Sequence, residues 1–159
     1  MSATRQVVGL VLWLVLCLGA GAAGSAVTRP VIGSWYAGLS KPAFTPPPGV
    51  FGPVWSLLYL MMAFAAWLVW RRGGWAGAGV PLALFLVQLA FNAGWSALFF
   101  GLRAPGPAFA EIVALWGLIA CTAWSFWRVA PAAGALLAPY LAWVTFAAAL
   151  NFGVWRLNA

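Results

Sequence analysis

Uncharged stretches constrain this chain more than any other feature of its sequence. Residues 6–28, 42–70, 73–102, 112–127 and 129–155 contain no Asp, Glu, Lys or Arg. Charged side chains are costly in hydrocarbon, so long apolar stretches without charge are typical of membrane spans. Apolar residues make up 65% of the 159 residues and charged residues only 6%, against roughly 25% charged in an ordinary soluble domain. We therefore expect an integral membrane protein.

The lengths of these stretches predict the number of spans. A transmembrane helix needs about 20 residues, so each stretch supplies one helix and none supplies two. Pro53, Pro81, Pro107 and Pro131 fall in the expected first turns, where a missing backbone N–H costs nothing. The sequence therefore predicts an all-α fold, a single domain over residues 1–159 with five transmembrane helices near 6–27, 50–70, 80–101, 107–127 and 132–156.

The first span has an alternative interpretation. Arg5, an apolar run and the small residues from Gly19 to Ala26 also resemble a signal peptide. The uncharged stretch is long for a signal peptide, which favours a retained helix. The positive charges do not orient the bundle, because five spans divide them equally between the two sides. One side holds Arg5, Arg71, Arg72 and Arg128, and the other holds Arg29, Lys41, Arg103 and Arg156.

The only long connection runs near residues 28–49. Its prolines favour an extended segment, and Trp and Tyr favour the headgroup region of a bilayer. The connection is therefore either an interfacial anchor or a lid over a pocket. The residues expected to form such a lid are Trp35, Lys41, Pro42 and Phe44.

The residue inventory excludes most site chemistries. The chain has no His, no Asp and one acid, Glu111, which argues against acid–base triads, paired-carboxylate hydrolases and metal sites. Cys17 and Cys121 lie in separate apolar runs and are expected to pack as small hydrophobes. The net charge of +7 is spread thinly, so a nucleic-acid surface is not expected. Glu111 is either a proton carrier or a first-turn acid near the interface.

Polar residues inside the spans mark the candidate site. Gln88, Asn92 and Ser96 are four residues apart and share one helix face. Trp55 and Tyr59 share a face of the second span, and the fifth span contains Tyr140, Trp143 and Asn151. These groups are either hydrogen-bonded contacts between helices or a pocket wall. For Gln88 and Asn151 we favour helix contacts, whereas Asn92 with Trp55 and Trp143 suits a flat, mostly apolar ligand.

Small residues recur at four-residue steps in the third span. Such stripes permit close helix approach, within the chain or across a dimer. The residues expected at a homodimer face are Ala90, Gly94, Ala97 and Gly101.

Several segments together resemble one known family. They are the run from Trp35 to Pro42, Pro46-Pro47, the run from Phe51 to Trp55, Leu58-Tyr59, the run from Gln88 to Asn92, Trp95-Ser96, the run from Phe99 to Gly101, the run from Pro139 to Trp143, Phe146-Ala147 and Leu150-Asn151. This pattern is similar to the translocator protein family, also called the tryptophan-rich sensory protein or peripheral benzodiazepine receptor family. It covers nearly the whole chain.

The resemblance implies a five-helix bundle, usually a homodimer, with a pocket closed by the first loop. It implies porphyrin, sterol and benzodiazepine or isoquinoline ligands, and no required cofactor. Bacterial members lie in an envelope membrane and animal members in the mitochondrial outer membrane; we favour a bacterium. The expected ligand-binding residues are Trp55, Tyr59, Gln88, Asn92, Tyr140, Ala142 and Trp143.

The chain departs from the family pattern in two places. Ala43, Phe44 and Gly49 stand where many members have loop tryptophans, and Phe152 replaces the tyrosine of a sterol motif.

From the resemblance and the aromatic residues of the spans we expect a membrane receptor or sensor for protoporphyrin-type tetrapyrroles. The alternatives are a transporter of porphyrin or sterol-like amphipaths, or an enzyme that degrades porphyrin in light through Trp55 and Trp143.

Overall fold

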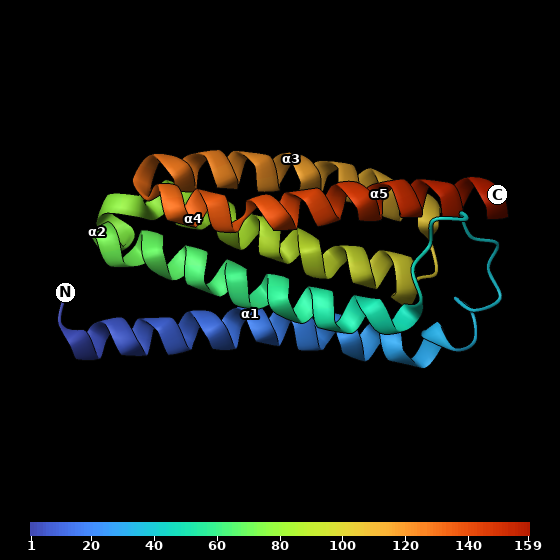
Figure 1. Cartoon of the computed structure of the whole chain (residues 1–159), viewed down its shortest axis with the longest axis horizontal. Helices are drawn as coiled ribbons and strands as arrows, with labels where there is room; N and C mark the ends of the chain where they lie inside the picture. The colour runs from blue at the N-terminus through green and yellow to red at the C-terminus, as the bar shows by residue number, and fades with distance from the viewer.

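The computed structural model describes all 159 residues and consists of helices without strands. Four helical stretches are long and apolar enough to cross a membrane, namely Ala3–Ile32, Pro48–Gly101, Pro105–Val129 and Pro131–Asn158. The helices lie side by side, with the two termini at opposite ends of the bundle (Figure 1). The fold class predicted from the sequence is all-helical and membrane-spanning, and this is confirmed.

Helix α1 (Ala3–Ile32) begins at Ser2, whose side chain accepts a hydrogen bond from the Arg5 backbone N–H. It extends five residues beyond the predicted end at residue 27, so the first part of the expected 28–49 lid is helical. Pro30 lies in the last turn, where its missing donor costs only one hydrogen bond. The outer face of α1 exposes apolar side chains such as Val7, Leu12 and Val15, as a lipid-facing surface requires.

Helix α2 (Phe51–Ser96) contains both the second and the third predicted spans and continues into the π-helical segment η2 (Ala97–Gly101). Its backbone is non-helical at Gly74, where φ is +57°, and at Ala78. A positive φ is unfavourable for residues that carry a Cβ, which explains why this position is a glycine. Figure 1 shows α2 turning back on itself near its label, so its two halves pack together.

A hydrogen bond demonstrates this reversal independently. The Tyr59 hydroxyl donates to the Asn92 side-chain oxygen, although the two residues are 33 positions apart in α2. A straight helix would separate them by about 50 Å. The predicted spans leave residues 71–79 as a connection between two helices. In the structure these residues are largely helical, and the reversal is made at Gly74 and Ala78, where two helices meet across a kink.

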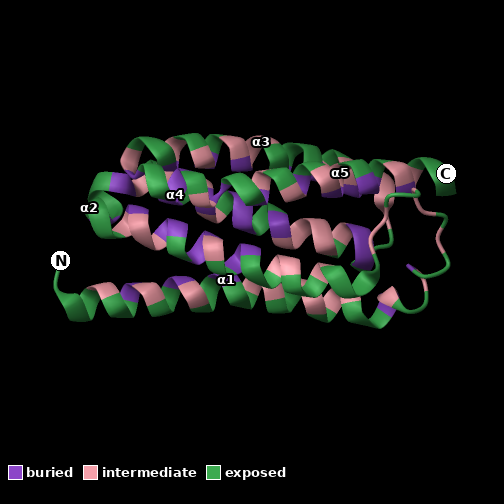
Figure 2. Ribbon diagram, viewed as in Figure 1, coloured by how far each residue is buried: buried purple, intermediate pink, exposed green.

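The remaining helices complete the bundle. Helix α3 (Pro105–Val129) is followed by the short α4 (Pro131–Leu136) and by α5 (Ala138–Asn158). The predicted fifth helix, 132–156, is thus divided at Leu137, because Pro139 has no N–H to continue the helical ladder. Buried residues run along the interior of all these helices (Figure 2). A short 3-10 turn, η1 (Pro48–Val50), leads from the loop into α2.

Candidate functional site

A cavity of about 610 Å³ lies between α1, both halves of α2, and α5, near the loop end of the bundle. This volume is in the usual range for small-molecule sites. Most of the large side chains that line it are aromatic: Tyr36, Phe51, Trp55, Tyr59, Trp95, Phe99, Phe100 and Trp143. One wall of α1 contributes small or polar residues, including Gly21, Ser25 and Thr28. The cavity therefore suits a flat, largely apolar molecule.

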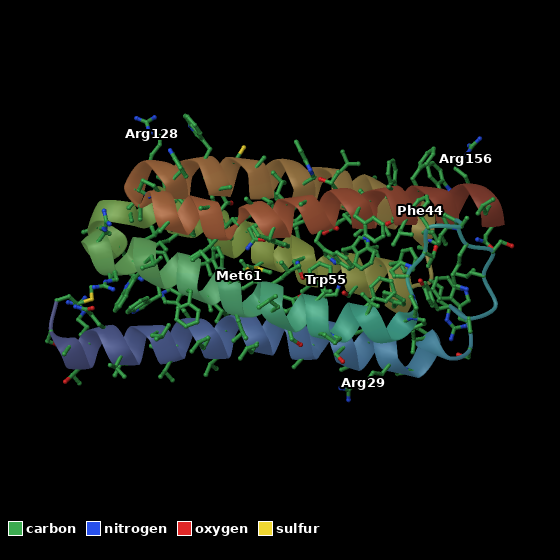
Figure 3. The ribbon with its side chains drawn as sticks, viewed as in Figure 1. Arg29, Phe44, Trp55, Met61, Arg128 and Arg156 are labelled. Atoms are coloured by element: carbon green, nitrogen blue, oxygen red, sulfur yellow. The ribbon has the colours of Figure 1, made fainter.

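Four of the predicted ligand-binding residues line this cavity: Trp55, Tyr59, Asn92 and Trp143. They come from both halves of α2 and from α5, and Figure 3 shows Trp55 between the helices. The rings of Trp55 and Tyr59 lie 5.8 Å apart, as their four-residue spacing on one helix face predicts. The structure thus brings together side chains that are almost 90 positions apart in the sequence.

Gln88, Tyr140 and Ala142 lie outside the cavity lining. Gln88 and Tyr140 are fully buried behind it, with 1% and 0% of their surfaces exposed. Tyr140 donates a hydrogen bond to Gln88 and accepts one from Asn92, each at 2.7 Å. Ala142 is exposed on the outer side of α5.

The four expected lid residues do not line the cavity either. Lys41 donates from its ammonium to the backbone oxygens of Ala37 and Leu39 and lies 4.9 Å above the Tyr36 ring. Trp35 packs against Phe99. Within residues 28–49 the cavity is lined instead by Thr28, Arg29 and Ile32 at the end of α1 and by Tyr36 and Pro48 of the loop.

The loop is held against α5 by three separate contacts. Asn158 accepts a hydrogen bond from the Ser40 N–H at 3.0 Å and donates to the Ser40 oxygen at 2.8 Å. Pro42 packs so closely on Gly153 that a Cβ on this glycine would overlap its ring. Farther along, the Phe44 ring lies 6.0 Å from Phe146. The loop is therefore docked, although Phe44 itself remains largely exposed.

Two buried polar atoms have no hydrogen-bond partner: one carboxylate oxygen of Glu111 and the indole nitrogen of Trp143. A buried donor without a partner carries a desolvation cost that a ligand acceptor would relieve. Trp143 belongs to the cavity wall, and its indole N–H is the buried donor of that wall that has no partner. Glu111 lies against Gly94, where a Cβ would be 3.3 Å from the other carboxylate oxygen.

Asn151 makes a contact between helices of the kind expected from the sequence. Its oxygen accepts from the Trp95 indole and its nitrogen donates to the Pro105 carbonyl, each at 2.8 Å. These bonds join α5 to α2 and to the start of α3. In the sequence Trp95 stands out only as part of the family motif Trp95-Ser96, whereas in the structure it lines the cavity.

The small-residue stripe divides between internal and external faces. A Cβ on Gly94 would approach Glu111, and one on Gly101 would lie 3.1 Å from Val27, so both glycines pack within the chain. Ala90 of α2 and Ala97 of η2 are exposed.

The fold and the cavity define a class: a helical membrane protein with an aromatic cavity inside its bundle. The family model described as the TspO/MBR family matches residues 13–156. The tryptophan-rich protein TspO of Chlorobaculum tepidum is 43% identical over 158 residues, covering 97% of this chain and 98% of the relative. The human translocator protein is 46% identical over 126 residues, covering 78% and 75%. The tryptophan-rich sensory protein of Cereibacter sphaeroides is 39% identical over 149 residues, covering 94% and 91%.

The chain belongs to the TspO/MBR family. This confirms the resemblance inferred from the loop and helix motifs. The names of the relatives describe translocator and sensory proteins, found in both bacteria and mammals.

Proposed function

We propose that this protein is a membrane receptor or sensor that binds protoporphyrin-type tetrapyrroles in the aromatic cavity. The observation that carries the proposal is the buried, unpartnered N–H of Trp143 in the wall of a cavity lined by aromatic rings. Flat aromatic walls stack on a macrocycle, and a lone donor orients one of its polar edges. The porphyrin is the ligand here, and binding requires no further cofactor. Benzodiazepine and isoquinoline compounds share these features and are proposed for the same cavity.

The proposal includes the course of the chain through the bilayer. We treat α2 as two crossings that reverse at Gly74 and Ala78, so the bundle crosses the membrane five times. The hydrogen bond between Tyr59 and Asn92 supports this arrangement, because it ties the two halves together. We place the protein in a bacterial envelope membrane, and the short connections between its helices support this choice. We also propose a homodimer that uses the outer face of α2 around Ala90 and Ala97.

The test is a titration of the detergent-solubilised protein with protoporphyrin in the dark, followed by the porphyrin absorption band. Trp143→Phe keeps an aromatic ring and removes the N–H, so affinity should fall several-fold, as expected for one hydrogen bond of about 1 kcal/mol. Asn92→Ala should weaken binding as well. Trp124→Phe is the matched control, because Trp124 is 66% exposed on the outside of α3. Binding that is non-saturable, or equal in all four proteins, would reject the proposed site.

A second candidate function is the light-dependent breakdown of the bound porphyrin. Trp55 favours it, because its ring lies in the cavity wall 5.8 Å from Tyr59 and 6.3 Å from Tyr140, close enough for these aromatics to take part in photochemistry. Product formation should require light and should be slower in Trp55→Phe than in the wild type. Rates equal to those of free porphyrin would exclude this activity.

The transporter alternative depends on Glu111, the one acid available for proton coupling. Its buried oxygen without a partner is the observation that favours this role. Uptake of porphyrin into liposomes driven by a pH gradient should then be lost in Glu111→Gln. Uptake that persists in this variant would exclude Glu111 as the coupling group.

A further inference from the structure

A chain of five hydrogen-bonding groups leads from the cavity wall into the core. The Tyr59 hydroxyl donates to the Asn92 oxygen, and the Asn92 nitrogen donates to the Tyr140 oxygen at 2.7 Å. The Tyr140 hydroxyl donates to the Gln88 oxygen at 2.7 Å. The Gln88 nitrogen ends the chain on the Met62 sulfur, at 3.9 Å. Only Tyr59 and Asn92 line the cavity; the other three side chains are buried behind them.

Met62, at the inner end of this series of hydrogen bonds, determines which group donates and which accepts in each bond. The thioether of Met62 has no hydrogen and can only accept, so it faces the amide nitrogen of Gln88 rather than its oxygen. Of the other buried polar side chains, Thr122 donates to the backbone of its own helix and Asn151 bonds to Trp95 and Pro105. Met62 therefore fixes which way the Gln88 amide points.

The donor and acceptor roles of Tyr140, Asn92 and Tyr59 are then fixed in turn. With its oxygen turned toward Tyr140, Gln88 takes the only proton of that hydroxyl. Tyr140 can then only accept from Asn92, which must present its nitrogen there and its oxygen to Tyr59. The one proton of Tyr59 is thus committed to Asn92. The Tyr59 hydroxyl can therefore offer only its lone pairs, and no hydrogen, to a ligand that reaches it.

We propose that Gln88 and Met62 are specificity-determining positioning residues, which act through Tyr140 and Asn92 to make the Tyr59 wall an acceptor. This inference rests on the proposed ligand-binding role of the cavity. The wall then favours ligands with an O–H or N–H donor at Tyr59 and a hydrogen-bond acceptor at Trp143, whose indole N–H has no partner. If the chain ran in the opposite direction, Tyr59 would donate to the ligand and the preference would be reversed.

Two substitutions outside the cavity wall remove the groups that fix which partner donates in each hydrogen bond. Met62→Leu removes the terminal acceptor and leaves an apolar side chain of similar size. Gln88→Leu removes the acceptor for Tyr140, whose proton can then be donated to Asn92 once that amide turns over. Met61→Leu is the matched control, because Met61, labelled in Figure 3, is the adjacent residue in α2, and the Gln88 amide bonds to the Met62 sulfur rather than to that of Met61.

The first measurement needs no ligand. The chain has three tyrosines, so ring-labelled tyrosine in a Tyr36→Phe background leaves only Tyr59 and Tyr140 in the infrared spectrum. The frequency of the tyrosine C–O stretch differs between a hydroxyl that donates and one that accepts. We expect Tyr59 to change from donor to acceptor of the Asn92 bond in Gln88→Leu, to be mixed in Met62→Leu, and to be unchanged in Met61→Leu. Identical spectra in all variants would overturn the proposal.

The second measurement compares two small flat probes, 2-naphthol and 2-methoxynaphthalene, of which only the first donates a hydrogen bond. Wild type and Met61→Leu should bind the naphthol several-fold more tightly than the ether. This ratio should fall in Met62→Leu and fall to one or below in Gln88→Leu. A ratio that is the same in all four proteins would overturn the proposal. If the ratio of the two probe affinities shifts as expected but the protein does not bind protoporphyrin, the role of Gln88 and Met62 is retained and the porphyrin ligand is rejected.

Discussion

At the scale of single residues, the cavity depends on the missing side chain of a glycine in α1 as well as on its aromatic rings. Gly21 of α1 lies against Tyr59, and a Cβ there would be 2.7 Å from the ring. The missing side chain therefore provides the space in which Tyr59 reaches Asn92. Gly19, two residues earlier, has nothing within 4 Å of such a Cβ.

Gly21→Ala should consequently displace the Tyr59 ring and weaken protoporphyrin binding, whereas Gly19→Ala should do neither. The overlap should also lower the free energy of unfolding by about 1–3 kcal/mol, the usual cost of an overpacked site. Thermal unfolding in detergent and the dark titration would measure both effects. Equal affinity and stability in the two alanine variants would show that the Tyr59 ring yields freely.

At the scale of elements, the loop between α1 and α2 is a docked segment. Two hydrogen bonds to Asn158 and the contact between Pro42 and Gly153 fasten it to α5. Through this docking, the end of the chain controls the segment that carries Tyr36 into the cavity. Trp35 and Tyr36 pack against Phe99 and Phe100, so we expect the hydrogen bonds to Asn158 to matter most for the order of the loop after these residues.

Asn158→Ala should release the loop, because both bonds to Ser40 are lost. Chymotrypsin should then cleave after Phe44 several-fold faster than in the wild type, since each lost bond is worth about 1 kcal/mol of local stability. Arg156→Ala is the control on the same helix, because Arg156 points away from the bundle (Figure 3). Cleavage rates that match in the wild type and Asn158→Ala would show that Pro42 alone holds the loop.

At the scale of the whole molecule, the bundle places its N-terminus and C-terminus at opposite ends. The arginines are distributed accordingly: Arg29 and Arg156 lie toward the loop end, while Arg128 lies toward the end that holds the N-terminus (Figure 3). The equal division of positive charge between the two ends predicts no preferred orientation.

The five crossings that we propose predict that the two termini lie on opposite sides of the membrane. Reporter fusions at the two ends should therefore be active in different compartments, and adding two lysines beside Arg71 and Arg72 should bias the orientation toward that end being cytoplasmic. Activity of both reporters in the same compartment would contradict five crossings and would require α2 to pass through the bilayer without its reversal.

Several features followed from the sequence because they depend on local composition. Uncharged apolar stretches of about 20 residues predict membrane helices wherever they occur, since hydrocarbon excludes charge from any part of a chain. The four-residue spacing of Trp55 and Tyr59 likewise sets their common face. The family followed from motifs that cover nearly the whole chain, and it is confirmed.

Other features required the tertiary structure. The rotation of each helix in the bundle decides whether a side chain faces the cavity, the core or lipid, and it depends on packing between residues far apart in the sequence. Phe99 and Phe100 therefore line the cavity although the sequence gives them no site role beyond the family pattern, while Ala142 faces outward and Gln88 lies in the core. The sequence by itself determined a helical membrane protein of this family. Only the packing of α1, α2 and α5 decided which of its many aromatic residues form one site. The reason is that contacts between helices, rather than neighbours along the chain, bring these residues together.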